Sequence, residues 1–385
     1  MESSFTRTSG ITDCHTAREI QTQPGLWHDT FASISHKQEE IKNFLETALS
    51  DENAVIILTG AGTSSYIGDV LSKIFQRNLK RNSESIPTTD LITNPNDYFQ
   101  RSKTTLLVSF ARSGDSPESQ AAVNLANECC CIVFHLIITC NPDGLLASNA
   151  TNKNSYVLFM PKSANDKALA MTGSFSSMLL AGILISDLNN LADNKNFVDR
   201  LVVYGETILE QFQQKIKEVA KIDFKRAVFL GSGLLKGIAR ESQLKVQELT
   251  DGVVICKFDS FLGLRHGPQV VIDKTTLVVY LFSRDFYINQ YEFDLVKSIN
   301  ESNNKLYEIG IGEVIKSNGK ISLDMPIELA SSNYLPEEYF AVCAILPAQL
   351  LGMYKSMNLG LSPDSPSVSK TINRVVQGVN IYPHQ

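Results

Sequence analysis

The sequence predicts an α/β protein built from two copies of one parallel-sheet unit. Short runs of β-branched and other apolar residues, the first at residues 55–59, alternate with helical segments. Such alternation is typical of a parallel sheet with helices on both faces. The strand-and-glycine pattern of residues 55–62 returns at residues 227–233, and the run 278–285 repeats that of residues 107–113. We therefore expect an internal repeat of one α/β unit.

Composition and charge narrow the class of protein. The 385-residue chain is 43% hydrophobic and 20% charged, which allows a large core. The formal net charge is −6 and no Lys/Arg cluster occurs, so we do not expect nucleic acid as a partner. The first residues contain no apolar signal region. We find no apolar run of membrane-spanning length either, so no membrane partner is expected.

The seven cysteines indicate a reducing compartment. Three are consecutive, Cys129–Cys131, and this spacing suits neither a disulfide framework nor paired metal ligands. We therefore expect mostly buried free thiols, a cytoplasmic location and no metal site.

Residues 1–52 are predicted to form a helical arm. Apolar residues recur at helical spacing from Phe31 to Leu49, and Gln23-Pro24-Gly25 is expected to interrupt the helices. An arm without a strand partner should pack across another element or another subunit. We expect the rest of the chain to divide into a first unit, 53–200, a second unit, 201–365, and a tail, 366–385.

The first strand ends in a loop rich in glycine and hydroxyl groups. Gly60-Ala61-Gly62-Thr63-Ser64-Ser65 follows residues 55–59 and precedes a helix over residues 66–77. This pattern is a poor match to a dinucleotide fingerprint, because hydroxyl residues replace its third glycine. The loop therefore favours a phosphate held by Thr63 and Ser64.

A second hydroxyl loop follows the apolar run 106–111. Its residues Ser113-Gly114-Asp115-Ser116 precede Pro117 at a predicted helix start, where unpaired N–H groups and the helix dipole attract anions. The alternative is an ordinary helix with Ser116 as its N-cap. Because loops at the carboxyl ends of parallel strands share one edge, we expect both loops to face one crevice.

The two copies are predicted to differ in their ligands. In the first unit, residues 170–176 add a third set of hydroxyl groups and begin a long, buried apolar helix that ends at Leu188. The second unit lacks the Ser-Gly-x-Ser loop. We therefore expect the second unit to keep the fold without the phosphate site, so that each chain binds one phosphate.

Charged residues of the second unit are candidates for acid–base chemistry. Glu241, Lys245 and Glu248 lie on one face of the helix predicted over residues 238–250. For Glu241 and Lys245, a solvated helix-stabilising pair is the favoured interpretation. The functional alternative makes Glu248 a base whose pKa Lys245 tunes. His266 lies on a predicted loop, where it either caps a turn or takes part in catalysis.

Together these motifs resemble the double SIS (sugar isomerase) family. They are similar to the isomerase half of glucosamine-6-phosphate synthase, and more closely to the stand-alone galactosamine-6-phosphate deaminase/isomerases, formerly labelled tagatose-6-phosphate ketose/aldose isomerases. Thr16-Ala17-Arg18-Glu19-Ile20 and residues 373–379 extend the resemblance over nearly the whole chain. It implies two tandem SIS domains, each a five-stranded parallel sheet flanked by helices. It also implies no cofactor and a homodimer or larger assembly with shared active sites.

The resemblance assigns binding roles in the first unit. Ser64, Ser113 and Ser116 match positions that hold the sugar phosphate, and Thr63 and Thr172 match positions that line the sugar. The synthase has Ser and Gln where this chain has Ala111 and Arg112, and Arg112 is a further candidate ligand of the phosphate.

The resemblance also assigns chemical roles. Glu248 matches the carboxylate that moves a proton between C1 and C2, on the helix that carries Lys245 and Glu241. His266 matches a ring-opening histidine that comes from the neighbouring subunit. Lys370 lies near the position of a Schiff-base lysine, although its spacing differs by one residue and a surface lysine is the alternative.

The activity implied is conversion of D-galactosamine 6-phosphate and water into D-tagatose 6-phosphate and ammonia. One alternative is aldose–ketose isomerisation of a hexose 6-phosphate without loss of nitrogen. A second is a phosphosugar sensor without catalytic activity.

Overall fold

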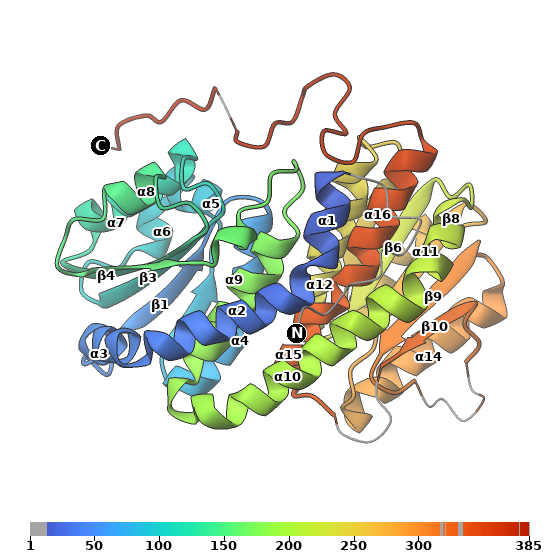
Figure 1. The fold of residues 1–385 in the computed structure, drawn as a ribbon, viewed down its shortest axis with the longest axis horizontal. Helices are drawn as coiled ribbons and strands as arrows, with labels where there is room; N and C mark the ends of the chain where they lie inside the picture. Colours follow the sequence, from blue (N-terminus) through green and yellow to red (C-terminus); the bar gives the residue numbers. More distant parts are fainter. Residues whose placement is uncertain (1–13, 316–318, 320, 330–333, 377, 385) are drawn as a thin grey trace, which may run out of the picture.

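The chain forms two five-stranded parallel sheets, as predicted (Figure 1). The computed structural model describes residues 14–315, 319, 321–329, 334–376 and 378–384. The strand order is β2-β1-β3-β4-β5 in the first sheet and β10-β9-β8-β6-β7 in the second. In each unit the opening strand therefore pairs with the second and third strands of that unit. This shared topology confirms the internal repeat.

The strands and the longer helices of the first unit follow the predicted alternation. Their bounds are β1 (Val55–Thr59), α4 (Thr63–Leu79), β2 (Asn82–Ser85), α5 (Thr88–Thr93), α6 (Pro95–Tyr98), β3 (Thr104–Ala111), α7 (Pro117–Cys129), β4 (Ile132–Thr139), α8 (Leu145–Ser148), β5 (Ser155–Phe159), η1 (Lys162–Ala164) and α9 (Gly173–Ser186). Every residue of α9 is buried, as its apolar sequence predicts.

A long helical connection leads to the second unit. It contains η2 (Leu188–Asn190), α10 (Leu191–Thr207), η3 (Ile208–Phe212) and α11 (Gln213–Ala220). The second unit contains β6 (Arg226–Gly231), α12 (Leu235–Leu249), β7 (Ile255–Asp259), α13 (Phe261–Arg265), η4 (Pro268–Val271), β8 (Thr276–Leu281), α14 (Phe286–Ser302), β9 (Tyr307–Gly312), β10 (Met325–Glu328), α15 (Glu337–Ala344) and α16 (Leu346–Asn358). The boundary predicted at residue 200 lies inside α10, and the domain limits stay predictions.

The N-terminal arm consists of α1 (His15–Gln21), α2 (Gln23–His36) and α3 (Gln38–Ala48). The expected interruption at Gln23-Pro24-Gly25 is wrong, because only Thr22 separates α1 from α2. Pro24 lies in the first turn of α2, where the N–H that proline lacks would have no helical partner. The arm packs within its own chain, with α2 against α9 and α10.

The segment after α16 is tied to α1, near the start of the described chain. The carboxylate of Asp364 accepts hydrogen bonds from the backbone N–H groups of His15 and Thr16, at 2.9 and 2.8 Å. It also accepts one from the Thr16 hydroxyl at 2.8 Å. This contact fixes the N-terminal arm to the segment that follows α16.

One hydrophobic core runs through both units. It contains strand residues of both sheets, for example Leu58 and Phe229, together with arm residues such as Trp27. The helices α4, α9, α12 and α16 lie between the sheets, and α4 of the first unit contacts α12 of the second (Figure 1). The two units therefore share their packing.

Two expectations about apolar and sulfur-containing residues need correction. All seven cysteines are free, but they are not mostly buried. Those buried are Cys130, Cys140 and Cys343, while Cys131 is exposed and the others, Cys14, Cys129 and Cys256, are half-buried. The stretch Glu337–Asn358, which the sequence analysis did not single out, is long and apolar enough to cross a membrane. Its most apolar window is 94% buried in the protein, as in a core helix of a soluble protein.

Candidate active site

A cavity of about 280 Å³ lies at the carboxyl ends of β1 and β3. Parts of both units and of the C-terminal tail line it. The lining residues are Ala61, Gly62, Thr63, Arg112, Leu169, Met171, Lys245, Glu248, Thr371, Ile372, Asn373, Arg374 and Val376. The cavity therefore brings together the glycine loop after β1, the start of the loop after β3, and the charged face of α12.

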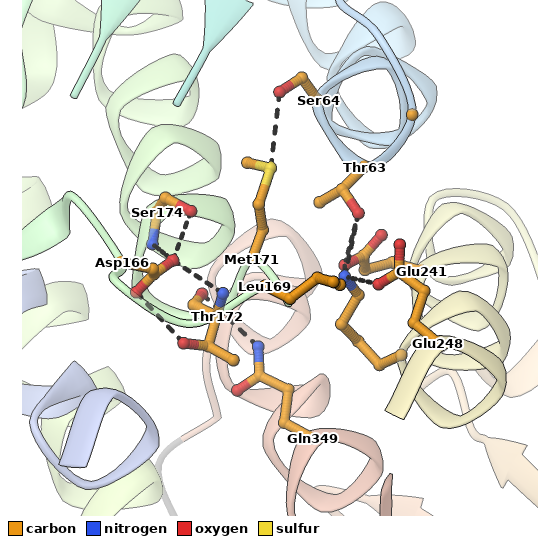
Figure 2. A network of polar contacts seen from close by, with 12 residues as sticks. Thr63, Ser64, Asp166, Leu169, Met171, Thr172, Ser174, Glu241, Glu248 and Gln349 are labelled. Carbon is orange, nitrogen blue, oxygen red and sulfur yellow. Dashed lines mark hydrogen bonds and ion pairs between the residues drawn. The ribbon is translucent and has the colours of Figure 1, made fainter. Parts of the chain in front are cut away.

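Lys245 is held between two carboxylates at this cavity (Figure 2). Its Nζ lies 2.6 Å from Glu248 and 3.3 Å from Glu241, and it donates a hydrogen bond to the Thr63 hydroxyl at 3.1 Å. Glu241 and Lys245 are fully buried, so the expected solvated pair is wrong. The sequence could not show this burial, because the face of α12 is covered by α4 of the other unit.

The environment sets the charges of this cluster. Burial raises the pKa of Glu241 to about 8, although Lys245 opposes this shift. For Lys245, burial lowers the pKa, but the two neighbouring carboxylates outweigh it and the pKa is raised. Only Glu248 keeps an exposed side-chain fraction, 23%. Glu248 is therefore the carboxylate of this cluster that a ligand in the cavity can reach.

The three predicted phosphate serines do not line this cavity. Ser64, in the first turn of α4, is buried, and its hydroxyl contacts the Met171 sulfur at 3.8 Å (Figure 2). The Ser116 side chain accepts from the N–H of Ser119 and so caps α7, as the structural alternative predicts. Ser113 is half-buried and its hydroxyl accepts from the N–H of Asp115 at 3.3 Å.

Thr172 is turned away from the cavity by Asp166, a residue that sequence reasoning missed. The buried Asp166 carboxylate accepts the N–H and hydroxyl of Thr172, at 2.8 and 3.2 Å (Figure 2). It also accepts the N–H and hydroxyl of Ser174 and the N–H of Gly173. Asp166 lies too far before α9 for a cap pattern to reveal it. Leu169 and Met171 line the cavity instead.

Arg112 lines the cavity and joins its wall to the tail. Its guanidinium donates to the carbonyl oxygens of Ala168 and Leu169, at 3.1 and 2.9 Å, and to that of Arg374 at 2.8 Å. Burial lowers its pKa. Arg374 in turn donates to Asn165 and to the carbonyl oxygen of Asp166. The role of Arg374 was also missed, since its partners lie about 200 residues away in the sequence.

His266 and Lys370 lie outside this cavity within the chain. His266 is exposed at the end of α13 in the second unit. Lys370 is exposed in the tail, beside the lining residue Thr371. In the part of the chain that the structure describes, no group of three or more His, Cys, Asp or Glu side chains is placed to hold a metal ion.

The fold and this cavity define a protein of the SIS (sugar isomerase) type, and comparisons with known proteins agree. The SIS domain model matches residues 48–185. The D-galactosamine-6-phosphate deaminase AgaS of Escherichia coli is 39% identical over 388 residues, with 100% of both chains covered. The AgaS of Shewanella sp. (strain ANA-3) is 39% identical over 372 residues, covering 96% of this chain and 92% of that one.

A solved structure matches equally well. The tagatose-6-phosphate ketose/aldose isomerase from Escherichia coli has a TM-score of 0.89 and 36% identity, and the match covers 99% of this chain and 100% of that one. The chain belongs to the SIS family, with the AgaS galactosamine-6-phosphate deaminases among its relatives. The resemblance predicted from the sequence is confirmed.

Proposed function

We propose that this protein is an enzyme that converts D-galactosamine 6-phosphate and water into D-tagatose 6-phosphate and ammonia. The observation that carries the proposal is the Glu248 carboxylate, held by Lys245 and partly exposed to the cavity. The AgaS relatives, similar over their whole length, indicate the substrate. The chemistry needs a base that can move a proton between neighbouring carbons, and Glu248 fits this need.

The proton transfer is proposed as follows. In the open-chain sugar, Glu248 removes the proton from C2, which the neighbouring C1 aldehyde acidifies, while the aldehyde oxygen takes up a proton from solvent and an enolamine forms. Glu248 then returns a proton to C1 and the nitrogen releases one to solvent, which leaves an imine at C2. Water adds to this imine, and loss of ammonia gives the 2-ketose. Lys245 would hold the Glu248 carboxylate in place during both transfers, since their charged groups lie 2.6 Å apart.

The phosphate group of the substrate is proposed to bind at the first unit. The N-termini of α4 and α7 offer N–H groups, and Ser64, Ser113 and Ser116 add hydroxyl donors. Ser113 and Ser116 both keep some solvent exposure, which leaves them open to a ligand. Thr63 would line the sugar. Arg112 stays a candidate ligand of the phosphate, although its guanidinium N–H groups donate to backbone carbonyl oxygens.

His266 is proposed to open the sugar ring from a second copy of the chain. It is exposed and lies outside the cavity of its own chain, so it needs another subunit to act. Exposed apolar side chains occur on the same unit as His266. They include Leu262, Val270, Phe286, Tyr287 and Tyr291. Such residues suit a homodimer interface. We also place the protein in the cytoplasm, where its seven free thiols would stay reduced.

The test is the Glu248→Gln variant, assayed for ammonia release from D-galactosamine 6-phosphate. Loss of the base should reduce kcat by about 10²- to 10⁴-fold, because general acid–base groups contribute rate factors of this size. Glu206→Gln is a matched control, since Glu206 is exposed on α10 and away from the cavity. Undiminished turnover by the Glu248 variant would contradict the assignment.

A second candidate is aldose–ketose isomerisation without loss of nitrogen. The similar solved structure from Escherichia coli, which carries the name tagatose-6-phosphate ketose/aldose isomerase, favours its consideration. Both reactions include the proton transfer between C1 and C2, but only the deamination releases ammonia. Measuring ammonia and ketose in the same reaction separates them, because deamination gives equal amounts of both.

A further inference from the structure

The turn after β8 in the second unit corresponds to the hydroxyl loop of the first. In the first sheet Thr59 pairs with Ser109, just before the glycine loop at residues 60–62. In the second sheet Leu230 pairs with Tyr280, at the same place before the loop at residues 231–233. The two registers therefore align residue by residue.

This alignment places Ser283 where the first unit has Arg112. The connection then runs for five residues before α7 begins at Pro117, but for three before α14 begins at Phe286. The second unit thus keeps the turn from strand to helix but shortens the loop. An anion would bind at this turn, residues 283–285, if the second unit still bound one.

A buried carboxylate occupies this place in the second unit. Glu292, on α14, is fully buried, and its carboxylate accepts the backbone N–H of Ser283 at 3.0 Å. It also accepts the side-chain amide of Asn289 at 3.0 Å. Burial raises the pKa of Glu292 to about 7, and Ser232 in the glycine loop after β6 lowers it. The carboxylate therefore lies between the ends of β6 and β8.

A second acid faces the same turn. The hydroxyl of Ser283 donates to Glu337 at the start of α15, while Asp285 caps α14 by accepting N–H groups of Tyr287 and Ile288. Both donors of Ser283 are therefore bound to carboxylates of the protein itself, and the N–H of Asp285 donates to the Ser283 hydroxyl. A free phosphate would have to displace the Glu292 carboxylate to reach the N–H of Ser283.

The first unit does not carry the matching acid. Glu292 is the seventh residue of α14, and the seventh residue of α7 is Val123. A valine supplies neither charge nor acceptor. At this helical position the first unit therefore has an apolar residue where the second has an acid, in addition to the difference in loop length.

We propose that the second unit retains an anion-binding site whose resident ligand is the Glu292 carboxylate, so that each chain has one vacant phosphate site. A carboxylate accepts N–H and hydroxyl donors as phosphate oxygens do, which allows the exchange. The ligand class that fits once the side chain is removed is a small oxyanion, such as formate, acetate or inorganic phosphate. The count of one vacant site rests on the phosphate site proposed for the first unit, whereas the exchange of Glu292 for a small anion rests neither on that site nor on the proposed reaction.

The test is chemical rescue of Glu292→Ala by small anions. We expect the variant to melt at a lower temperature than the wild type. Formate, acetate or phosphate, but not chloride at equal ionic strength, should restore much of the loss in a saturable way. Glu308→Ala is the matched control, since Glu308 is also a buried acid of this unit but contacts the side chains of Tyr280, Asn300 and Lys305 instead of a backbone N–H of the turn. Equal responses of both variants would overturn the proposal.

Two further measurements keep the proposal falsifiable. If Glu292→Ala does not fold alone, its refolding yield is measured with and without formate, and no gain with formate would overturn the proposal. Equilibrium dialysis of inorganic phosphate should give one site per chain in the wild type and two in the variant. Two sites in the wild type, or one in a folded variant, would equally contradict it.

Discussion

At the scale of single residues, Lys245 balances the buried charge of the cavity. It is the cation that lies within 3.3 Å of both Glu241 and Glu248. Lys245→Met would leave these acids without their partner. We expect it to lower the free energy of unfolding by about 3–5 kcal/mol, the usual cost of breaking a buried ion pair.

Glu241→Gln is the comparison for that variant, measured by urea denaturation at pH 7. Burial raises the pKa of Glu241 and so favours its neutral form, which an uncharged amide replaces at lower cost. Both variants should lose turnover, but only the lysine variant should lose most of its stability. Equal losses of stability would show that Lys245 does not carry the charge balance.

His135 is a second residue with a measurable effect, on acid stability. Burial on β4 lowers its pKa from 6.5 to about 4, so the folded protein keeps it neutral while the unfolded chain takes up a proton. The contribution of neutral His135 to the free energy of unfolding is complete above pH 6.5 and is lost as the pH falls towards 4. The shift corresponds to about 3 kcal/mol.

His135→Gln should therefore flatten the loss of stability between pH 6.5 and 4. Glutamine can still bond to Asn127, the present partner of His135, without titrating. Comparing wild type and variant at each pH cancels the contributions of buried acids such as Glu19, whose raised pKa acts in the opposite sense. Parallel pH profiles would contradict the assignment.

At the scale of elements, the crossing of α2 and α10 is tightly packed. A Cβ added to Gly205 on α10 would lie 2.5 Å from the Trp27 ring and 3.1 Å from Pro24. Gly205→Ala should therefore destabilise the protein by about 1–3 kcal/mol. Trp27 is the single tryptophan and is fully buried, so its fluorescence reports this contact during unfolding.

Gly25→Ala should give the opposite result on α2, the other helix of this crossing. Gly25 is exposed within α2, and its added Cβ meets no atom within 4 Å. Because alanine is the better helix former, we expect a gain of up to about 1 kcal/mol. A destabilised Gly25 variant would show that helix propensity does not decide the effect at this crossing.

Local sequence patterns predicted most helices and strands, because the signal for each lies in neighbouring residues. The apolar run of α9, the cap at Ser116 and the repeat of the two sheets are examples. The burial of Lys245 was not predictable, since α4 of the other unit covers it. The roles of Asp166 and Arg374 were missed for the same reason, because each forms hydrogen bonds with residues outside its own local pattern. Whether the predicted site residues act as proposed stays a prediction.

At the scale of the whole molecule, the tail closes the cavity over the first unit. It runs from α16 across the loops and helices of that unit (Figure 1), and residues 371–374 line the cavity. Arg374→Ala should loosen this wall. We expect kcat/KM to fall roughly tenfold, which corresponds to one charged hydrogen bond of about 1.5 kcal/mol, and proteolysis of the tail to become faster.

Arg200→Ala is the control for this variant. Arg200 also donates to a backbone carbonyl, that of Tyr334, at 2.7 Å, but it lies on α10 and away from the cavity. We expect it to leave kcat/KM and cleavage of the tail unchanged. Similar kinetics for both arginine variants would rule out a specific role of the tail.

The hydrogen bonds between Asp364 and α1 have a consequence for dissecting the chain. The two halves share one topology, yet helices of the first pack on those of the second, and the segment after α16 is tied to the N-terminal arm. Cutting the chain between the halves would expose the apolar surfaces that α4 and α12 bury against each other. We therefore expect neither half, expressed alone, to stay soluble as a folded unit.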